Sequence, residues 1–213
     1  MHVELLYHTP DPERAIATAA RLCYAPVGAA ELMETMSEER MHSVLSTIMA
    51  SGHFSTLEHV SYTFAIDGVS RALTHQLVRH RLASFNQQSQ RYSEFKEGVS
   101  VVKPESVLAN EEANAVFDEA IEAATSAYKK LLEAGVPAED ARYLLPNAAE
   151  SKIVVTMNVR ELLHFFSLRC CNRAQWRFAS WHIACWSLRV PRLRSFLPTR
   201  GRRVCAAHVP KVK

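Results

Sequence analysis

The most distinctive stretch of the chain reads Arg79-His80-Arg81-Leu82-Ala83-Ser84-Phe85-Asn86-Gln87-Gln88-Ser89-Gln90-Arg91, and we call it the signature segment. It holds three arginines, one histidine, two serines and four side-chain amides, but no lysine. An arginine keeps its charge at any cellular pH, and its planar fork can hold a phosphate through two hydrogen bonds. Each amide offers both a donor and an acceptor, as contact with the edge of a pyrimidine or flavin ring requires. The composition therefore predicts a site for an anionic ligand that carries a heterocycle.

The residues just before and within the signature segment predict its secondary structure. Apolar residues recur at helical spacing across residues 69–80, and Ser70 is suited to the N-cap position. We therefore expect a helix that places Gln76 and Arg79 one turn apart on a single face. Residues 83–90 are polar and lack a helical period, so we expect a loop there. A helix that leads into a polar loop can place several donors around one ligand.

Patterns elsewhere along the chain predict further strands and helices. Residues 2–8 and 58–67 alternate in polarity and residues 151–159 are rich in Ile and Val, so we expect three strands. Residues 91–95 are expected to continue extended. Thr9 or Asp11 can cap a first helix, and Ser37 can cap a second. The expected helices span residues 12–23, 37–50, 110–134, 137–145, 160–170 and 174–190.

These elements alternate without the regular order of strand, helix and strand that builds a parallel sheet. The pattern favours an α+β fold, with a mixed or antiparallel sheet flanked by helices. The sequence also contains no GxGxxG phosphate loop, so a Rossmann site for a flavin or nicotinamide cofactor has no support. A dinucleotide that binds this chain must therefore be held by side chains.

Length and composition are those of one domain, and we expect residues 1–213 to form it. No apolar run of about eighteen residues occurs, and the first twenty residues lack a signal-peptide pattern, so we expect a cytoplasmic protein with no membrane partner. The five cysteines, an odd number, fit a reducing compartment better than a disulfide framework. They include no C-x₂-C pair, so we expect no metal site.

The charge of the chain is divided unevenly along its length. No acidic residue follows Glu161, whereas eleven arginines and lysines do, although the net charge is only +3. Such a split suggests an anionic partner for the C-terminal third, whether a phosphate-rich cofactor, an acidic subunit or a nucleic acid. We expect about residues 190–213 to form a basic C-terminal arm or tail.

Four motifs carry a resemblance to a known family. The signature segment fits RHRxxSxNxxSxR at all seven specified positions, whereas an arginine-rich stretch without such a pattern usually marks a solvated surface. Residues 52–59 fit GHxSxxEH, residues 140–146 resemble DAR-x-LP with one additional residue, and residues 158–169 fit NxRxLxxFxxLR. The chain thereby resembles the flavin-dependent thymidylate synthases, the ThyX family.

The resemblance implies an activity and an assembly. Members convert dUMP to dTMP by reductive methylation, with methylenetetrahydrofolate as the one-carbon donor and with FAD, reduced by NADPH, as the hydride source. They have a fold of their own and form homotetramers whose active sites lie between subunits. The resemblance therefore implies an enzyme with dUMP as its substrate and FAD as its cofactor, and we expect no nucleic-acid partner.

The resemblance also assigns site residues, position by position. The residues that would surround dUMP are Gln76, Arg79, Gln87, Gln88, Ser89, Gln90, Arg91, Arg142 and Arg169. The residues that would contact FAD are Ser55, Arg79, His80, Arg81, Gln87, Asn158, Arg160 and His164. Two positions depart from the usual pattern, because many members carry Glu at position 87 and several carry Asn at position 164. The first departure removes a negative charge close to the rings.

The expected chemistry makes Arg169 the catalytic candidate. Methylation at C5 needs an electron-rich uracil ring, and a fixed positive charge beside O2 and N3 favours the N3-deprotonated form. A covalent role for Ser89 is less favoured, because no base lies three or four residues away to activate its hydroxyl. Two other classes remain open, a nucleic-acid-binding protein and a flavoprotein reductase. The first leaves the signature segment unexplained, and the second does not need Arg142 or Arg169.

Overall fold

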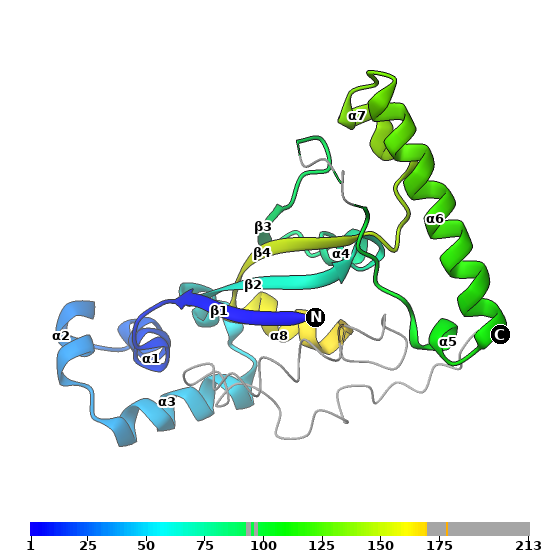
Figure 1. Cartoon of the computed structure of the whole chain (residues 1–213). Helices are drawn as coiled ribbons and strands as arrows, with labels where there is room; N and C mark the ends of the chain where they lie inside the picture. The colour runs from blue at the N-terminus through cyan, green and yellow to red at the C-terminus, as the bar shows by residue number, and fades with distance from the viewer. Residues whose placement is uncertain (93–94, 96–97, 170–177, 179–213) are drawn as a thin grey trace. The chain divides into compact units, whose positions relative to one another are not determined.

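The computed structural model describes residues 1–92, 95, 98–169 and 178, and Figure 1 labels its elements. Its strands are β1 (His2–His8), β2 (Ser61–Ser70), β3 (Ala83–Gln87) and β4 (Glu150–Asn158). Its α-helices are α1 (Pro12–Leu22), α2 (Ala29–Thr35), α3 (Glu38–Ser51), α4 (Arg71–Leu77), α5 (Glu105–Leu108), α6 (Glu111–Glu133), α7 (Ala138–Ala141) and α8 (Val159–Arg169). Two 3₁₀ turns, η1 (Phe54–His59) and η2 (Arg142–Leu144), complete the described elements.

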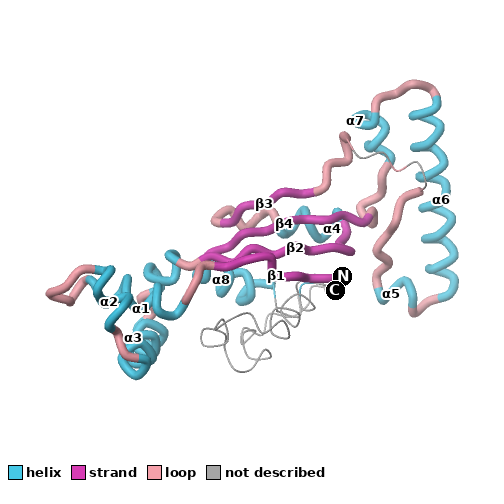
Figure 2. The backbone as a smooth tube through the Cα atoms, turned by 60° about the vertical axis from the view of Figure 1, so that its left-hand side comes forward, coloured by secondary structure: helices cyan, strands magenta, loops and turns pink. Residues whose placement is uncertain are grey.

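The strands form one four-stranded sheet in the order β1-β2-β4-β3, drawn in magenta in Figure 2. Alternate residues of β4 are buried, from Ser151 to Met157, as expected when every second side chain of a strand faces the same side. The residues between them are exposed or half-buried. Helices together with an antiparallel sheet confirm the predicted α+β class, and the fold is not of the Rossmann type.

Most predicted elements are confirmed, with boundaries within a few residues. Of three predicted caps, two make the capping hydrogen bond and one does not. Ser37 Oγ accepts the Arg40 N–H at 3.3 Å, and Ser70 Oγ accepts the Leu73 N–H at 3.2 Å. Asp11 occupies the N-cap position of α1, but its side chain makes no capping hydrogen bond. The sequence thus shows which residues are able to cap a helix, whereas the local backbone decides whether their side chains make the capping hydrogen bond.

The sequence prediction is wrong around the signature segment. The expected loop over residues 83–90 contains strand β3, whose polar side chains are exposed or half-buried. Sheet pairing uses backbone groups, so it does not require apolar side chains. Helix α4 ends at Leu77, so Gln76 and Arg79 do not share one helix face as expected, although the Arg79 N–H donates to the Gln76 carbonyl at 3.3 Å.

Other differences concern boundaries and two missed helices. The strand predicted over residues 58–67 begins only at Ser61, because the preceding residues wind into η1. Helices α2 and α5 are not predicted, because their seven and four residues are too few for a clear helical period. Residues 91 and 92, expected to be extended, form a turn. The helix predicted over residues 174–190 and the basic segment 190–213 lie outside the described residues.

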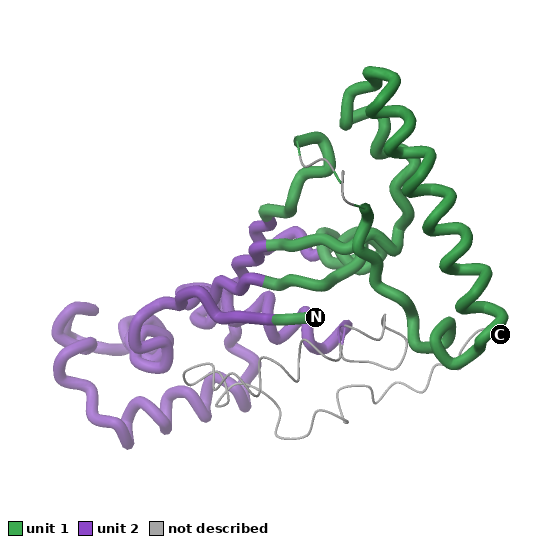
Figure 3. Tube along the Cα trace, viewed as in Figure 1, with its two compact units in different colours: residues 1–2, 66–79, 86–153 green, residues 3–65, 80–85, 154–213 purple. Residues whose placement is uncertain are grey.

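The chain divides into two compact units, coloured separately in Figure 3. Unit 1 consists of residues 1–2, 66–79 and 86–153, and unit 2 of residues 3–65, 80–85 and 154–213. Each unit is built from three separate segments, so neither corresponds to one continuous stretch of sequence. The prediction that the whole chain is a single domain stays a prediction.

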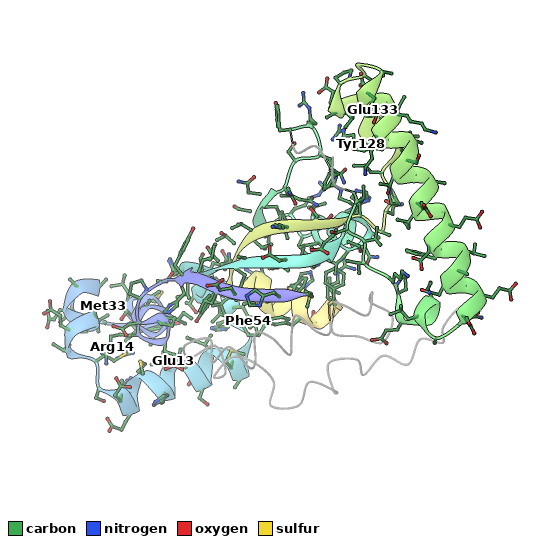
Figure 4. All side chains as sticks on the ribbon, viewed as in Figure 1. Glu13, Arg14, Met33, Phe54, Tyr128 and Glu133 are labelled. Atoms are coloured by element: carbon green, nitrogen blue, oxygen red, sulfur yellow. The ribbon has the colours of Figure 1, made fainter. Side chains whose placement is uncertain are left out.

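Each unit has its own buried side chains. In unit 2, Arg14 of α1 donates to the Met36 carbonyl at 2.6 Å and to the Glu38 carboxylate at 2.7 Å, which ties α1 to the start of α3 (Figure 4). In unit 1, α5 and α7 pack on α6, whose Tyr128 is fully buried. Within the described residues, no helix is long and apolar enough to cross a lipid bilayer.

The buried cap of α4 offers a test of this local structure. We expect Ser70→Ala to lower the free energy of unfolding by about 1–2 kcal/mol, because it leaves the Leu73 N–H without its acceptor in a buried setting. The matched control is Ser37→Ala, which removes an exposed cap from α3 and should lower the free energy of unfolding by a smaller amount. Urea unfolding of both variants measures the difference. An equal or smaller loss for Ser70→Ala would contradict the role of its burial.

Candidate functional site

In unit 1, Gln87 joins the end of β3 to its neighbours. Its Nε2 donates to Thr74 Oγ1 at 3.0 Å and to Ser151 Oγ at 2.9 Å. Thr74 is buried on α4, where its hydroxyl donates to the Arg71 carbonyl at 3.0 Å, and Ser151 is buried on β4. These bonds fix the amide of Gln87 and turn its nitrogen toward the protein. A ligand would therefore meet the carbonyl oxygen of this side chain, which is an acceptor.

Two predicted arginines of unit 1 gather at one glutamate. The Glu139 carboxylate accepts the Nε–H of Arg91 at 2.6 Å and lies 2.5 Å from its Nη2. The Glu139 carbonyl accepts the Nε–H of Arg142 at 2.9 Å. Burial lowers the pKa of Arg71, and the positive charge of Arg142 lowers it further. The positive side chains named here thus outnumber the Glu139 carboxylate, and this balance of charge suits an anionic group of a ligand.

The last residues of the signature segment turn over the end of β3. The Gln88 N–H donates to the Lys152 carbonyl at 2.9 Å and continues the pairing with β4. Ser89 Oγ accepts the Arg91 N–H at 3.1 Å, so this hydroxyl shapes the turn. The Nε2 of Gln90 is buried and has no hydrogen-bond partner among the described residues. A buried donor without a partner is uncommon, and an acceptor on a ligand would satisfy it.

In unit 2, Arg81 and Asn158 line an open cavity of about 270 Å³. Asn158 Oδ1 accepts the Glu161 N–H at 2.8 Å, which is the geometry of an N-cap at the start of α8. The cap leaves the amide nitrogen of Asn158 as the group that could serve a ligand. The other lining residues are Ser61, Leu82, Ala83, Ser84 and Thr156.

Exposed groups on η1 and α8 of unit 2 lie near one another. Arg160 of α8 forms an ion pair with Glu58 of η1, and both side chains are about half exposed. Ser55 is exposed on η1, and His164 is exposed on α8. These two elements pack together, so three of the predicted cofactor residues belong to one surface region of unit 2.

A buried imidazole in unit 2 lies between two charged groups. His80 Nδ1 is 2.8 Å from Glu161 Oε1, and His80 Nε2 accepts the Nε–H of Arg169 at 3.1 Å. The guanidinium of Arg169 also lies 5.3 Å from the ring centre of Phe178. Burial lowers the pKa of His80, the Glu161 hydrogen bond opposes this shift, and the charge of Arg169 adds to it. The imidazole is therefore neutral at neutral pH.

The predicted residues separate into two groups. Unit 1 holds Gln76, Arg79, Gln87, Gln88, Ser89, Gln90, Arg91 and Arg142. Unit 2 holds Ser55, His80, Arg81, Asn158, Arg160, His164 and Arg169. The predicted substrate residues other than Arg169 are thus in unit 1, and the predicted cofactor residues other than Arg79 and Gln87 are in unit 2.

Three residues at these sites were missed from sequence. Glu139 meets Arg142 through its backbone carbonyl and Arg91 through its carboxylate, and no sequence spacing indicates either contact. Glu161 is a charged residue within an apolar helical stretch, which is a recognisable signal for a buried partner. Arg71 carries no such signal. Within the described part of the chain, no cluster of three or more His, Cys, Asp or Glu could hold a metal ion, and the expected absence of a metal stays a prediction.

Comparisons with known proteins agree with the resemblance. The family model described as "Thymidylate synthase complementing protein" matches residues 4–189. The flavin-dependent thymidylate synthase of Geobacter sulfurreducens is 59% identical over 177 residues, covering 83% of this chain and 76% of the relative. That of Clostridium tetani is 47% identical over 190 residues, covering 82% and 76%.

A solved structure has the same fold. Thymidylate synthase X of Helicobacter pylori, crystallised with FAD and dUMP, superposes with a TM-score of 0.72 and covers 92% of this chain and 97% of its own. The sequence identity is 24%, so this likeness bears on the fold alone.

The lowered pKa of His80 predicts an effect of pH on stability. The unfolded chain takes up a proton near pH 6.5, the ordinary value, whereas the folded chain keeps His80 neutral to lower pH. The free energy of unfolding should therefore fall below about pH 6.5, by at most about 1.4 kcal/mol per pH unit from this group. His80→Gln cannot titrate, so its stability relative to the wild type should improve between pH 7.5 and pH 5. Urea unfolding at both pH values measures this change, and a constant difference would count against it.

Proposed function

The chain belongs to the flavin-dependent thymidylate synthase family, and we propose on that basis that it methylates dUMP to dTMP. The observation that carries this proposal beyond family membership lies in unit 1. There, Arg91 and Arg142 converge on a single glutamate, and Gln90 keeps a buried donor without a partner among the described residues. Positive charge for a phosphate and amides for a ring together suit a nucleoside monophosphate.

We propose that dUMP is held mainly by residues of unit 1. Arg91 and Arg142 would bind its phosphate, with the phosphate replacing the carboxylate of Glu139 as the partner of Arg91. Gln87 would offer its carbonyl oxygen and Gln90 its amide donor to the uracil or the sugar. The remaining proposed substrate residues are Gln76, Arg79, Gln88, Ser89 and, from unit 2, Arg169.

The donor groups of unit 2 fit an anionic dinucleotide cofactor. Arg81 and Asn158 line a cavity, and Arg160 is held in an exposed position by Glu58. Guanidinium and amide donors at such a surface can bind a diphosphate without a phosphate loop. The proposed FAD residues are Ser55, Arg79, His80, Arg81, Gln87, Asn158, Arg160 and His164. FAD reduced by NADPH supplies a hydride, and methylenetetrahydrofolate supplies the one-carbon unit.

Arg169 is the proposed catalytic residue. Its guanidinium is held on one edge by the His80 imidazole and on one face by the Phe178 ring, so the charge is fixed before any ligand binds. A fixed charge needs no rearrangement when negative charge develops nearby, and it therefore stabilises a developing anion well. Placed beside O2 and N3 of uracil, it would lower the pKa of N3 and make C5 more nucleophilic.

We also propose that the active form is a homotetramer. Val116 on α6 and Leu108 on α5 are more than half exposed, which is consistent with a covered apolar surface in an assembly. Light scattering of the purified protein measures the assembly directly. A cytoplasmic location and the absence of a nucleic-acid partner stay predictions.

The visible spectrum of the purified protein tests the proposal first. We expect a flavin spectrum, either as isolated or after FAD is added, that bleaches when NADPH is added without oxygen. With dUMP and methylenetetrahydrofolate present, the same sample should form dTMP. A protein that takes up FAD and oxidises NADPH but never forms dTMP would instead be a flavoprotein reductase, and one that takes up no FAD would contradict the proposal.

The proposed role of Arg169 predicts that its removal reduces dTMP formation but not FAD binding. Arg169→Ala should reduce dTMP formation by about 10²- to 10³-fold, the usual cost of removing one preorganised electrostatic group. FAD content should remain unchanged, because the other proposed cofactor residues are intact. Arg40→Ala, an exposed arginine on α3, is the control and should be fully active. A near wild-type rate for Arg169→Ala would show that the role belongs to another residue.

A further inference from the structure

The three-residue chain formed by Glu161, His80 and Arg169 has a defined direction of hydrogen bonding. A guanidinium carries only N–H donors, so Nε2 of His80 must be the acceptor in its 3.1 Å contact with Arg169 Nε. A neutral imidazole with Nε2 unprotonated carries its proton on Nδ1. That N–H then donates to the Glu161 carboxylate at 2.8 Å. The structure therefore selects one tautomer of His80.

We propose that Glu161 and His80 are positioning residues that hold the Arg169 guanidinium in one orientation. This inference rests on the proposed function of Arg169 at the uracil ring. Glu161 acts on His80 alone, by accepting the Nδ1 proton and so keeping Nε2 available as an acceptor. His80 in turn directs Arg169 through its Nε–H, while the Phe178 ring lies against the guanidinium. Neither residue needs to touch the substrate for this role.

Burial strengthens the hydrogen bond between His80 and Glu161. The side chains of His80 and Glu161 are only 4% and 5% exposed, so water does not compete for their hydrogen bond. In such a setting, a hydrogen bond to a charged group is strong, and its loss leaves a buried carboxylate without its donor. The ring of His80 also meets the ring of Phe165 edge-on at 5.1 Å between centres. The imidazole is therefore fixed in position as well as in tautomer.

The same arrangement makes the position of Arg169 depend on pH. Among the described residues, the titratable groups that act on the ring are Glu161, Arg169 and His164, all on α8. Glu161 favours the protonated imidazole, whereas burial and the other two groups disfavour it. Once His80 is protonated, Nε2 becomes a donor and can no longer accept from Arg169. Two adjacent cations then repel each other, and the guanidinium loses its fixed orientation.

Two variants test the inference in the FAD-loaded enzyme. In Glu161→Gln the new amide can either accept from Nδ1 or donate to it, so both tautomers of His80 become accessible. We expect dTMP formation to fall about tenfold, with unchanged FAD content and unchanged NADPH oxidation. The acid limb of the pH–rate profile should also move to lower pH, because the group that raises the His80 pKa is lost.

The second variant, His80→Gln, can keep both hydrogen bonds of His80 but has no imidazole that titrates. Its amide can donate to Glu161 and accept from Arg169, and because His80 is also a proposed FAD residue, the rate is expressed per bound FAD and compared between pH 6 and pH 8. The acid limb due to His80 should disappear. Glu119→Gln, an exposed glutamate on α6, is the matched control and should leave both the rate and the profile unchanged.

A measurement without turnover examines the tautomer directly. Nitrogen-15 NMR of the wild-type protein, without substrate, should show His80 protonated at Nδ1 and unprotonated at Nε2 at neutral pH. The opposite tautomer would overturn the inference. So would a wild-type rate for Glu161→Gln together with wild-type pH profiles for both variants, provided that Arg169→Ala is inactive. If Arg169→Ala is itself active, the proposed role of Arg169 fails first, so the two failures are distinguishable.

Discussion

The contact between His80 and Glu161 joins parts of the chain that are 81 residues apart. It buries a carboxylate and an imidazole, groups that are costly to remove from water unless each finds its partner. The placement of His80 against α8 satisfies both groups. Because Arg169 lies on the same helix and donates to the same ring, this requirement also determines where its charge is found. The position of the Arg169 guanidinium in unit 2 therefore depends on this one satisfied pair.

The division of the signature segment between the two units accounts for the fixed spacing of its residues. Its first arginine and its last six residues belong to unit 1, whereas residues 80–85 belong to unit 2. One short stretch therefore supplies side chains to both groups of predicted ligand residues. An insertion within it would shift β3 by one residue and turn each of its side chains to the opposite face of the sheet.

Local sequence patterns predicted the long elements well and the short ones poorly. The 23-residue helix α6, with its Asn110 cap, and strand β4 carry enough periodic residues to be recognised. Strand β3 is polar, so its place in the sheet follows from backbone pairing with β4 and from the side-chain hydrogen bond of Gln87 to Ser151, not from apolar side chains. In the site, residue types such as the arginines and amides could be selected from sequence. Contacts such as that of Glu161 with His80 could not, because they depend on segments brought together by the fold.

The strand order has a consequence for how the protein is made. Strand β4 lies between β2 and β3, yet 62 residues (88–149) separate it in sequence from the end of β3. During synthesis, the end of β3 therefore leaves the ribosome about 3–12 s before β4, and β2 leaves earlier still. Throughout that interval the edges that pair with β4 lack their native partner, and unpaired edges readily join other chains. Conditions that slow translation between residues 88 and 149 should thus favour aggregation of the nascent protein over its folding.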